Sequence, residues 1–177
     1  RQPWAASQST AEGAGACRVR AAKTRAACCG PAAATEETAL ELSERGFSAL
    51  PYHAGLGPEV RRGSQEKFIR DEVSIIVATI AFGMGIDKAN IRTVIHVGLP
   101  ATVEGYYQEI GRAGRDGVDS DCILFYSWAD VKLQERFLSD IDDPDLYWTK
   151  VEAAKSLFRL AENGGCRHQK ILEEAPS

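Results

Sequence analysis

The feature that most constrains the fold is a continuous apolar run, VSIIVAT, over residues 73–79. This run lacks the apolar–polar alternation of a half-exposed strand, so it predicts a strand that is buried on both faces. Two further strands are predicted over residues 93–97 and 122–126, and helical patterns alternate with them. Strands that alternate with helices predict an α/β domain with a parallel sheet and flanking helices.

Capping residues and glycines indicate where the helices begin and end. Thr35 is predicted to cap a first helix that Gly46 ends, and an extended run follows over residues 47–52. Pro58 suits the first position of a second helix because its nitrogen has no hydrogen to leave unpaired. Further helices are expected, in chain order, over residues 58–70, 102–108, 128–138 and 146–161.

Residues 1–34 differ from the rest of the chain. They are rich in Ala, Arg, Ser and Gly and show no hydrophobic period, so we interpret them as disordered or poorly packed. The part CRVRAAKTRAACCGPAAA is not expected to supply a buried strand. An organelle transit peptide and an extension foreign to the fold both fit this composition. The predicted organisation is an extension over residues 1–34, an α/β domain over 35–127 and a helical segment over 128–177.

Charge and cysteine content exclude some classes of protein. The net charge is −4, and the first 34 residues carry five basic residues and one acidic residue, so the remainder carries −8. This balance argues against a protein that coats nucleic acid, although a local basic groove stays compatible. No apolar run approaches the roughly 18 residues of a membrane span, so no membrane partner is expected. Five cysteines without a C-x-x-C pair favour a reducing compartment such as the cytoplasm, nucleoid or nucleus.

The run GYYQEIGRAGRDG, residues 105–117, places two arginines and two glycines close together. If the helix that begins at residue 102 continues, Gln108, Arg112 and Arg115 lie on one stripe at i, i+4 and i+7. Gly111 and Gly114 then leave space for another surface to approach. Two guanidiniums on one stripe suit a polyanion such as a triphosphate. A surface helix with solvated arginines explains the spacing equally well.

The segment that follows the first predicted strand carries a second candidate site. Gly83 and Gly85 flank Met84 in a loop that ends near Asp87. In open α/β sheets ligands bind at the carboxyl ends of the strands, and glycines let backbone N–H groups approach a phosphate or a nucleic-acid backbone. Asp87 suits a ribose hydroxyl or the neighbouring arginines. A tight turn with Asp87 as a cap is the alternative.

The aromatic residues have two readings as well. Tyr106 and Tyr107 precede the arginines and are expected to pack in the core or to bind through their hydroxyls, rather than to stack on bases. Trp128, Tyr147 and Trp148 fall on helical segments and are also expected in the core.

Taken together, the two candidate sites resemble the RecQ family of DNA helicases over residues 35 to about 172. AFGMGIDKANIRTVIH resembles motif V of that family, YYQEIGRAGRDG resembles motif VI, and YHAGL resembles the motif that follows motif IV. RNA helicases carry a related arginine motif, but the residues of the motifs in this sequence are closer to those of the RecQ family. The resemblance implies the second RecA-like motor domain, a parallel sheet of the P-loop NTPase type, followed by a short helical extension.

The resemblance also implies roles for single residues. Arg115 corresponds to the arginine finger at the γ-phosphate of ATP, Arg112 to a residue that couples the nucleotide to domain closure, and Gln108 to the same network. The residues implied in coupling ATP to DNA are Thr79, Gly83, Gly85 and Asp87, and those implied in contacting DNA are His53, Gly55, Met84 and Lys88. His53 equally fits a buried core residue.

The family uses ATP and Mg²⁺ to unwind DNA from 3′ to 5′ in repair and recombination. The first motor domain holds both, and its G-x-x-x-x-G-K-[ST] motif and Asp-Glu-Ala-His-like box do not occur in this sequence. We therefore expect the chain to be inactive alone and to need a RecQ-type first motor domain, with single-stranded or forked DNA as substrate.

Cys166 resembles the first cysteine of the family's zinc-binding subdomain. No further cysteine follows it, and a structural zinc needs about four ligands, so zinc is not expected to bind. Two alternatives to the motor half stay open. One is a catalytically inactive remnant that binds DNA or a protein weakly, and the other is half of an RNA helicase.

Overall fold

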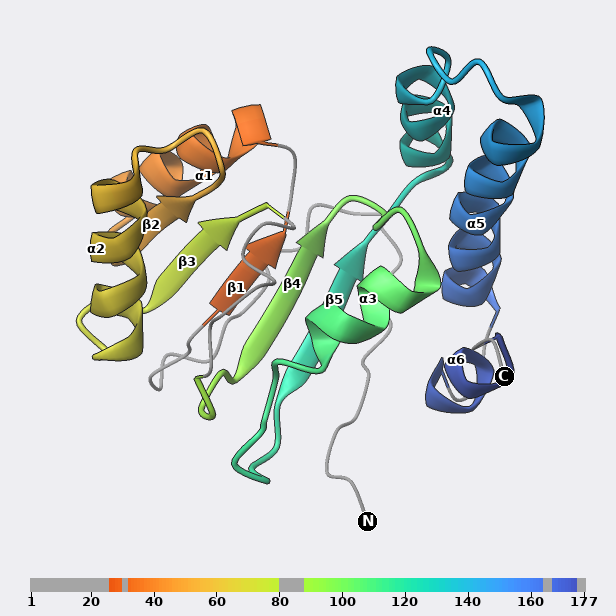
Figure 1. The fold of residues 1–177 in the computed structure, drawn as a ribbon. Helices are drawn as coiled ribbons and strands as arrows, with labels where there is room; N and C mark the ends of the chain where they lie inside the picture. Colours follow the sequence, from red (N-terminus) through yellow and green to blue (C-terminus); the bar gives the residue numbers. More distant parts are fainter. Residues whose placement is uncertain (1–25, 30–31, 80–87, 164–166, 175–177) are drawn as a thin grey trace.

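The computed structural model describes residues 26–29, 32–79, 88–163 and 167–174, and it contains one parallel sheet (Figure 1). The strand order is β2-β3-β1-β4-β5, and every described pairing is parallel. The strands are β1 (Ala26–Cys29), β2 (Ala49–Tyr52), β3 (Ile75–Ala78), β4 (Thr93–Val97) and β5 (Asp121–Phe125). The helices are α1 (Ala32–Glu44), α2 (Pro58–Ile69), α3 (Val103–Ile110), α4 (Trp128–Phe137), α5 (Pro144–Glu162) and α6 (Arg167–Glu174).

Most predicted elements are confirmed within two or three residues at each end. The second helix begins at Pro58 as predicted, and Gly46 follows the first helix with φ of +86°, which a glycine adopts without strain. The prediction that Thr35 caps the first helix is wrong. The helix begins at Ala32, and Thr35 lies inside it with 1% of its surface exposed.

Strand β1 corrects the interpretation of the N-terminal segment. Residues 26–29 pair with β3 on one side and with β4 on the other, so they form the central strand of the sheet. The expectation that residues 17–34 supply no strand is therefore wrong for this part. Alanine and cysteine have no strong strand preference, and here the hydrogen bonds to two neighbours decide the conformation. The predicted disorder of residues 1–25 lies outside the described residues.

Strand β3 is buried on both faces, as its apolar run predicts. Ile75 and Val77 pack with Ala39 of α1, whereas Ile76 packs with Phe68 of α2. Alternate residues of a strand point to opposite faces, so α1 and α2 cover opposite faces of the sheet. Among the described helices, none is long and apolar enough to cross a membrane.

The C-terminal helices pack on the β5 side of the sheet (Figure 1). A second core joins α3, β5, α5 and α6 through Tyr106, Leu124, Leu157 and Ile171. The prediction of a helical segment after residue 127 is confirmed by α4, α5 and α6.

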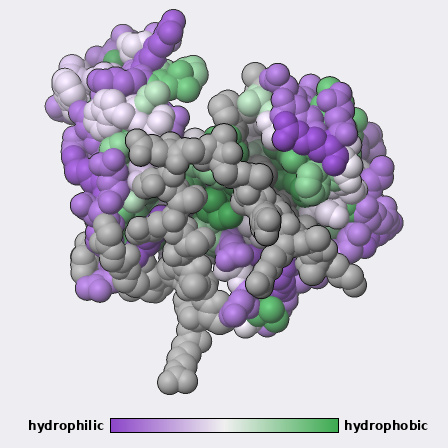
Figure 2. Space-filling model, turned by 180° about the vertical axis from the view of Figure 1, so that it is seen from behind, coloured by the Kyte–Doolittle hydropathy of each residue, from purple (hydrophilic) through white to green (hydrophobic). Residues whose placement is uncertain are grey.

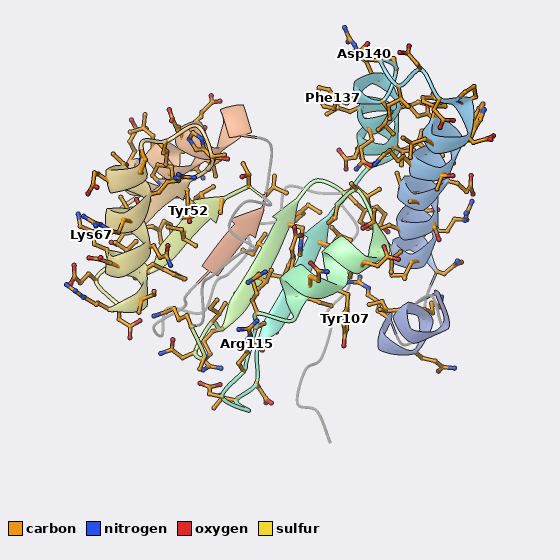
Figure 3. All side chains as sticks on the ribbon, viewed as in Figure 1. Tyr52, Lys67, Tyr107, Arg115, Phe137 and Asp140 are labelled. Atoms are coloured by element: carbon orange, nitrogen blue, oxygen red, sulfur yellow. The ribbon has the colours of Figure 1, made fainter. Side chains whose placement is uncertain are left out.

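Aromatic residues in this region only partly follow the prediction of core packing. Tyr106 is buried, but Tyr107, Trp128 and Trp148 are exposed, Trp148 to 61%. Phe137 is 73% exposed and points away from α5 (Figure 3), and hydrophobic residues are visible on this lobe from behind (Figure 2).

Candidate functional site

The helix before the arginine-rich run ends at Ile110, two residues beyond its predicted end at Gln108, and it does not continue through the arginines. Thr102, where the sequence predicts the start of this helix, caps α3 by accepting a hydrogen bond from the Gly105 N–H at 3.0 Å. The helix ends at Ile110, and residues 111–116 form turns. The interpretation of Gln108, Arg112 and Arg115 as one stripe of a continuous helix is therefore wrong. Gln108 lies on α3, and both arginines lie on the turn that follows it, which we call the arginine turn (residues 111–117).

Gly114 accounts for one of the two glycines in this turn. Its φ is +61°, in the left-handed region. A Cβ atom at this position would lie 2.5 Å from Ser120 Oγ and 2.8 Å from the Val118 carbonyl oxygen. The missing side chain thus allows the turn to pack closely against Val118 and Ser120. The sequence pattern instead predicts that another surface fills this space.

Backbone hydrogen bonds fasten the arginine turn to the chain that precedes β4. The Gly114 N–H donates to the Ile91 carbonyl at 2.9 Å, and the Asp116 N–H donates to the Ala89 carbonyl at 3.2 Å. An ion pair between Arg92 and Asp116 also joins the turn to the segment before β4. The turn is therefore held at the amino end of β4 by residues that follow the second candidate segment.

The arginines differ in exposure. Arg115 is exposed, and its Nε donates to the Gly111 carbonyl at 3.1 Å (Figure 3). Arg112 is half-buried, and Gln108 is exposed. Arg115 thus lies at the surface of a turn whose backbone is held by hydrogen bonds, and a guanidinium in that position suits capture of an anion such as a phosphate.

Three of the residues assigned to DNA or to its coupling with ATP lie at the opposite ends of the strands from the arginine turn: Thr79, His53 and Gly55. Thr79 follows β3, and its N–H donates to the Tyr52 carbonyl at 3.2 Å, while His53 and Gly55 follow β2. The described strands are parallel, so these three residues lie at the carboxyl ends, whereas the arginine turn lies at the amino end of β4. The structure does not bring these three residues to the arginines, whereas Lys88 directly precedes Ala89, to which the turn is bonded.

His53 has the geometry of a packed residue. It is 8% exposed, and its Nε2 lies 3.0 Å from Glu36 Oε1. A Cβ at Gly55 would lie 3.1 Å from His53 Nδ1, so the absence of a side chain makes room for the imidazole ring. The alternative of a satisfied buried histidine fits this environment, and contact of either residue with DNA stays a prediction.

Lys88 also has a structural environment. Its side chain is 4% exposed, and its ammonium donates to Asp71 Oδ1 at 2.5 Å and to the Ile69 carbonyl at 3.0 Å. It also lies 5.1 Å from the centre of the Phe68 ring. The prediction that Lys88 contacts DNA does not fit this geometry, because its ammonium is buried and already bonds two oxygens of this chain, those of Asp71 and Ile69.

We expect Lys88→Met to lower the free energy of unfolding by about 2 kcal/mol, because it removes the buried ammonium that bonds Asp71 and the Ile69 carbonyl. Chemical denaturation measures this loss. Lys67→Met on the exposed face of α2 is the matched control and should change stability by less than about 0.5 kcal/mol. Equal effects of the two substitutions would contradict a structural role for Lys88.

The remaining predicted residues lie outside the described residues: Gly83, Met84, Gly85, Asp87 and Cys166. Within the described ranges, no group of three His, Cys, Asp or Glu side chains is placed to hold a metal ion.

Asp116 makes the arginine turn sensitive to acid. The side-chain hydrogen bond from Arg92 holds the pKa of the Asp116 carboxyl below its ordinary value, and the Val118 N–H adds to this effect. A lowered pKa in the folded state means that the ion pair stabilises the turn above the ordinary pKa. That stabilisation is lost as the pH falls through the lowered value.

We therefore expect the melting temperatures of the wild type and Asp116→Asn to differ above pH 5 and to converge as the pH falls below about 4. Thermal unfolding between pH 3 and pH 7 measures this difference. A difference that stays constant over this range would mean that Asp116 contributes nothing through its charge.

A hollow of about 660 Å³ lies between α4, α5 and the segment that follows β4. Its lining is mostly apolar and includes Phe137, Leu133 and Leu146. Gln108, Arg112 and Arg115 do not line it. The hollow therefore does not mark the face that presents the arginines.

Comparison with known proteins identifies the family. The family described as "Helicase conserved C-terminal domain" matches residues 22–117, which is more than half of the chain. The chain belongs to this family. The match begins before β1, which agrees with the place of that strand in the sheet of this helicase C-terminal domain.

Individual relatives confirm the resemblance to RecQ helicases. The "RecQ-like DNA helicase BLM" of Xenopus laevis is 56% identical over 135 residues, which cover 74% of this chain and 10% of that protein. The "ATP-dependent DNA helicase RecQ" of Bacillus subtilis is 56% identical over 121 residues, covering 68% of this chain and 20% of that protein. The chain spans between 10% and 23% of the length of eight curated relatives that it matches, these two among them.

A solved structure confirms the fold. The DEAD box protein from Methanococcus jannaschii matches with a TM-score of 0.56 and 28% identity, over 68% of this chain and 35% of that chain. The prediction of a RecA-like α/β domain with a parallel sheet is therefore correct for the helicase C-terminal domain.

The sequence reasoning missed one buried pair beside this site. His96 of β4 and Glu109 of α3 lie 2.6 Å apart, with side-chain exposures of 1% and 11%. One feature of the sequence could have indicated that Glu109 has a partner. It is a carboxylate in the last turn of a short helix, where the helix dipole disfavours negative charge.

Proposed function

We propose that the chain is the C-terminal motor half of a RecQ-like ATP-dependent DNA helicase. In this account the arginine turn supplies positive charge to ATP, and the carboxyl ends of β2 and β3 face DNA. The observation that carries the proposal is the fastened turn, which offers Arg115 to solvent from a fixed backbone. The 56% identity to proteins named as DNA helicases supports the same conclusion.

Arg115 is the arginine finger in this proposal, and Arg112 links the nucleotide to domain closure. An arginine beside the γ-phosphate stabilises the charge that develops on the phosphoryl oxygens during transfer. A guanidinium keeps its charge at every physiological pH, so this function needs no proton transfer from Arg115. Gln108, exposed on α3, contributes a polar contact on the same side.

ATP and Mg²⁺ are bound mainly by a separate first motor domain. The 177 residues contain no phosphate-binding loop of the G-x-x-x-x-G-K-[ST] type, so this chain contributes the second wall of the nucleotide site. ATP supplies the phosphoryl group, and the first motor domain supplies the loop that binds the phosphates. The chain alone is therefore expected to hydrolyse nothing.

DNA is the proposed polymer, with translocation from 3′ to 5′ and a role in repair and recombination. Thr79, at the carboxyl end of β3, and the segment that follows it supply the DNA side. The net charge of −8 outside residues 1–34 means that contact with the phosphate backbone is local.

The competing function is a catalytically inactive remnant that binds DNA or a protein weakly. The absent phosphate-binding loop favours it for the chain in isolation. Restored activity in a mixture with a first motor domain would exclude it.

An unwinding assay tests the proposal. The chain, a RecQ-type first motor domain and ATP are mixed with a fluorescent duplex that carries a 3′ or a 5′ single-stranded tail, made of DNA or of RNA. We expect unwinding only of the DNA duplex with the 3′ tail. Unwinding of RNA alone would favour the RNA-helicase alternative, and strand-binding without unwinding would favour the remnant.

A further inference from the structure

The buried pair of His96 and Glu109 joins β4 to the helix that leads into the arginine turn. His96 Nε2 lies 2.6 Å from Glu109 Oε2. An ionised carboxylate only accepts hydrogen bonds, so Nε2 donates. The other ring nitrogen, Nδ1, is buried and has no hydrogen-bond partner in the part of the chain that the structure describes.

This arrangement is costly for packing alone. Burying a carboxylate costs free energy unless its partners compensate fully, and the unpaired Nδ1 adds a further cost. Glu109 also lies in the last turn of α3, where the helix dipole opposes a negative charge. Apolar side chains of similar size would fill the space without these costs. They would not fix the distance between β4 and α3, or their relative orientation, as a hydrogen bond does.

Glu109 is connected directly to the backbone of the arginine turn. Its carbonyl accepts the Arg112 N–H at 3.3 Å, and the Ile110 carbonyl accepts the Ala113 N–H at 3.0 Å. Helix α3 has only eight residues, and helices of this length are not stable alone. Contacts with the rest of the fold must therefore fix where α3 ends.

Tyr106 closes the other side of the pair. Its ring centre lies 5.2 Å from that of His96, and it lies one turn before Glu109 on the same face of α3. Its hydroxyl accepts a hydrogen bond from Arg167 Nη1 of α6 at 3.4 Å. His96 thus contacts two residues of α3, Tyr106 through its ring and Glu109 through its Nε2.

We infer that His96 and Glu109 are positioning residues for Arg112 and Arg115. The bond fixes the end of α3 against β4, so the turn begins at one defined point and the two guanidiniums project in defined directions. The function of this positioning rests on the proposed role of the arginines, but the local order that it creates does not.

Amide hydrogen exchange of the full chain, followed by NMR, tests the local order. Glu109→Met removes the acceptor with little change in size, and Glu109→Gln keeps an acceptor oxygen. Glu104→Met replaces an exposed acid in the first turn of α3 and is the matched control. We expect Glu109→Met to speed exchange at the Ala113 and Gly114 amides by about tenfold relative to β3 amides, Glu109→Gln to restore most of the protection, and the control to match the wild type.

Two outcomes would overturn the inference. One is unchanged exchange at both amides in Glu109→Met, and the other is an increase that β3 amides share in full, which would indicate a contribution to global stability alone. Thermal unfolding of each variant reports that global effect separately.

ATP turnover with an added first motor domain tests whether this positioning affects function. Glu109→Met should lower kcat by about tenfold while KM for ATP changes less than twofold, and Glu109→Gln should recover most of kcat. An unchanged kcat alongside faster exchange would overturn the positioning role. If the wild-type mixture shows no turnover, the proposed function fails, and the exchange measurement still decides whether the pair orders the turn.

Discussion

Gly114→Ala is expected to destabilise the domain more than any other substitution in the arginine turn. The left-handed backbone, with φ of +61°, costs a residue with a side chain about 1–2 kcal/mol. The new Cβ would also lie 2.5 Å from Ser120 Oγ and 2.8 Å from a backbone carbonyl, and such overpacking costs about 1–3 kcal/mol. We therefore expect a total loss of about 2–5 kcal/mol in the free energy of unfolding, measured by chemical denaturation.

Gly117→Ala is the matched control for this prediction. Gly117 has a similar φ of +78°, but apart from its two chain neighbours no atom of the described residues lies within 4 Å of the position that its Cβ would take. The control should therefore lose only the conformational part, about 1–2 kcal/mol. Equal losses at the two positions would show that the close approach to Ser120 does not constrain the turn.

Arg115→Ala is expected to have the largest effect on activity. An arginine finger contributes about 10³- to 10⁵-fold to kcat in enzymes that transfer phosphoryl groups, so turnover in the presence of a first motor domain should fall by at least about 10³-fold. Arg115 is exposed, so its removal should leave the melting temperature nearly unchanged. Steady-state ATP hydrolysis with saturating single-stranded DNA measures the first effect, and thermal unfolding measures the second.

Arg136→Ala, on the exposed face of α4, is the control for loss of positive charge. It should retain the turnover of the wild type. A fall of less than tenfold in Arg115→Ala would mean that this arginine does not meet the γ-phosphate. A tenfold or greater fall in the control would point to net charge as the cause.

The sequence predicts the regular part of the fold well because its physical signals are local. The aliphatic run that ends at Thr79 is unambiguous, and Pro58 and Thr102 mark helix starts through their own chemistry. Strand β1 has no such signal. Its Ala and Cys residues become a strand only through pairing with β3 and β4, whose positions the local sequence does not reveal.

The candidate site is predicted by residue type but not by geometry. The prediction of one arginine stripe assumed that the helix continues past Gln108, and it interpreted the two glycines only as space for another surface. The structure ends the helix at Ile110, and the Arg112 and Ala113 N–H groups then donate to carbonyls three residues back, in a tighter turn than that of an α-helix. The role of Arg115 in this turn stays a prediction.

Long-range pairs were beyond the reach of sequence patterns. His96 and Glu109 are 13 residues apart on different elements, and Lys88 meets Asp71 across 17 residues. Neither spacing belongs to a helix or strand period, so only the fold reveals these partners.

ATP hydrolysis by the wild-type chain, measured with and without a separately expressed RecQ-type first motor domain, tests the central claim most directly. The rate is followed at saturating ATP, Mg²⁺ and single-stranded DNA for the chain, the first domain and their mixture. The account predicts no turnover by the chain, and DNA-stimulated turnover by the mixture that exceeds the rate of the first domain alone by at least about 10³-fold. A mixture no faster than the first domain, with the chain folded and bound to it, would contradict the claim that this chain completes the ATP site.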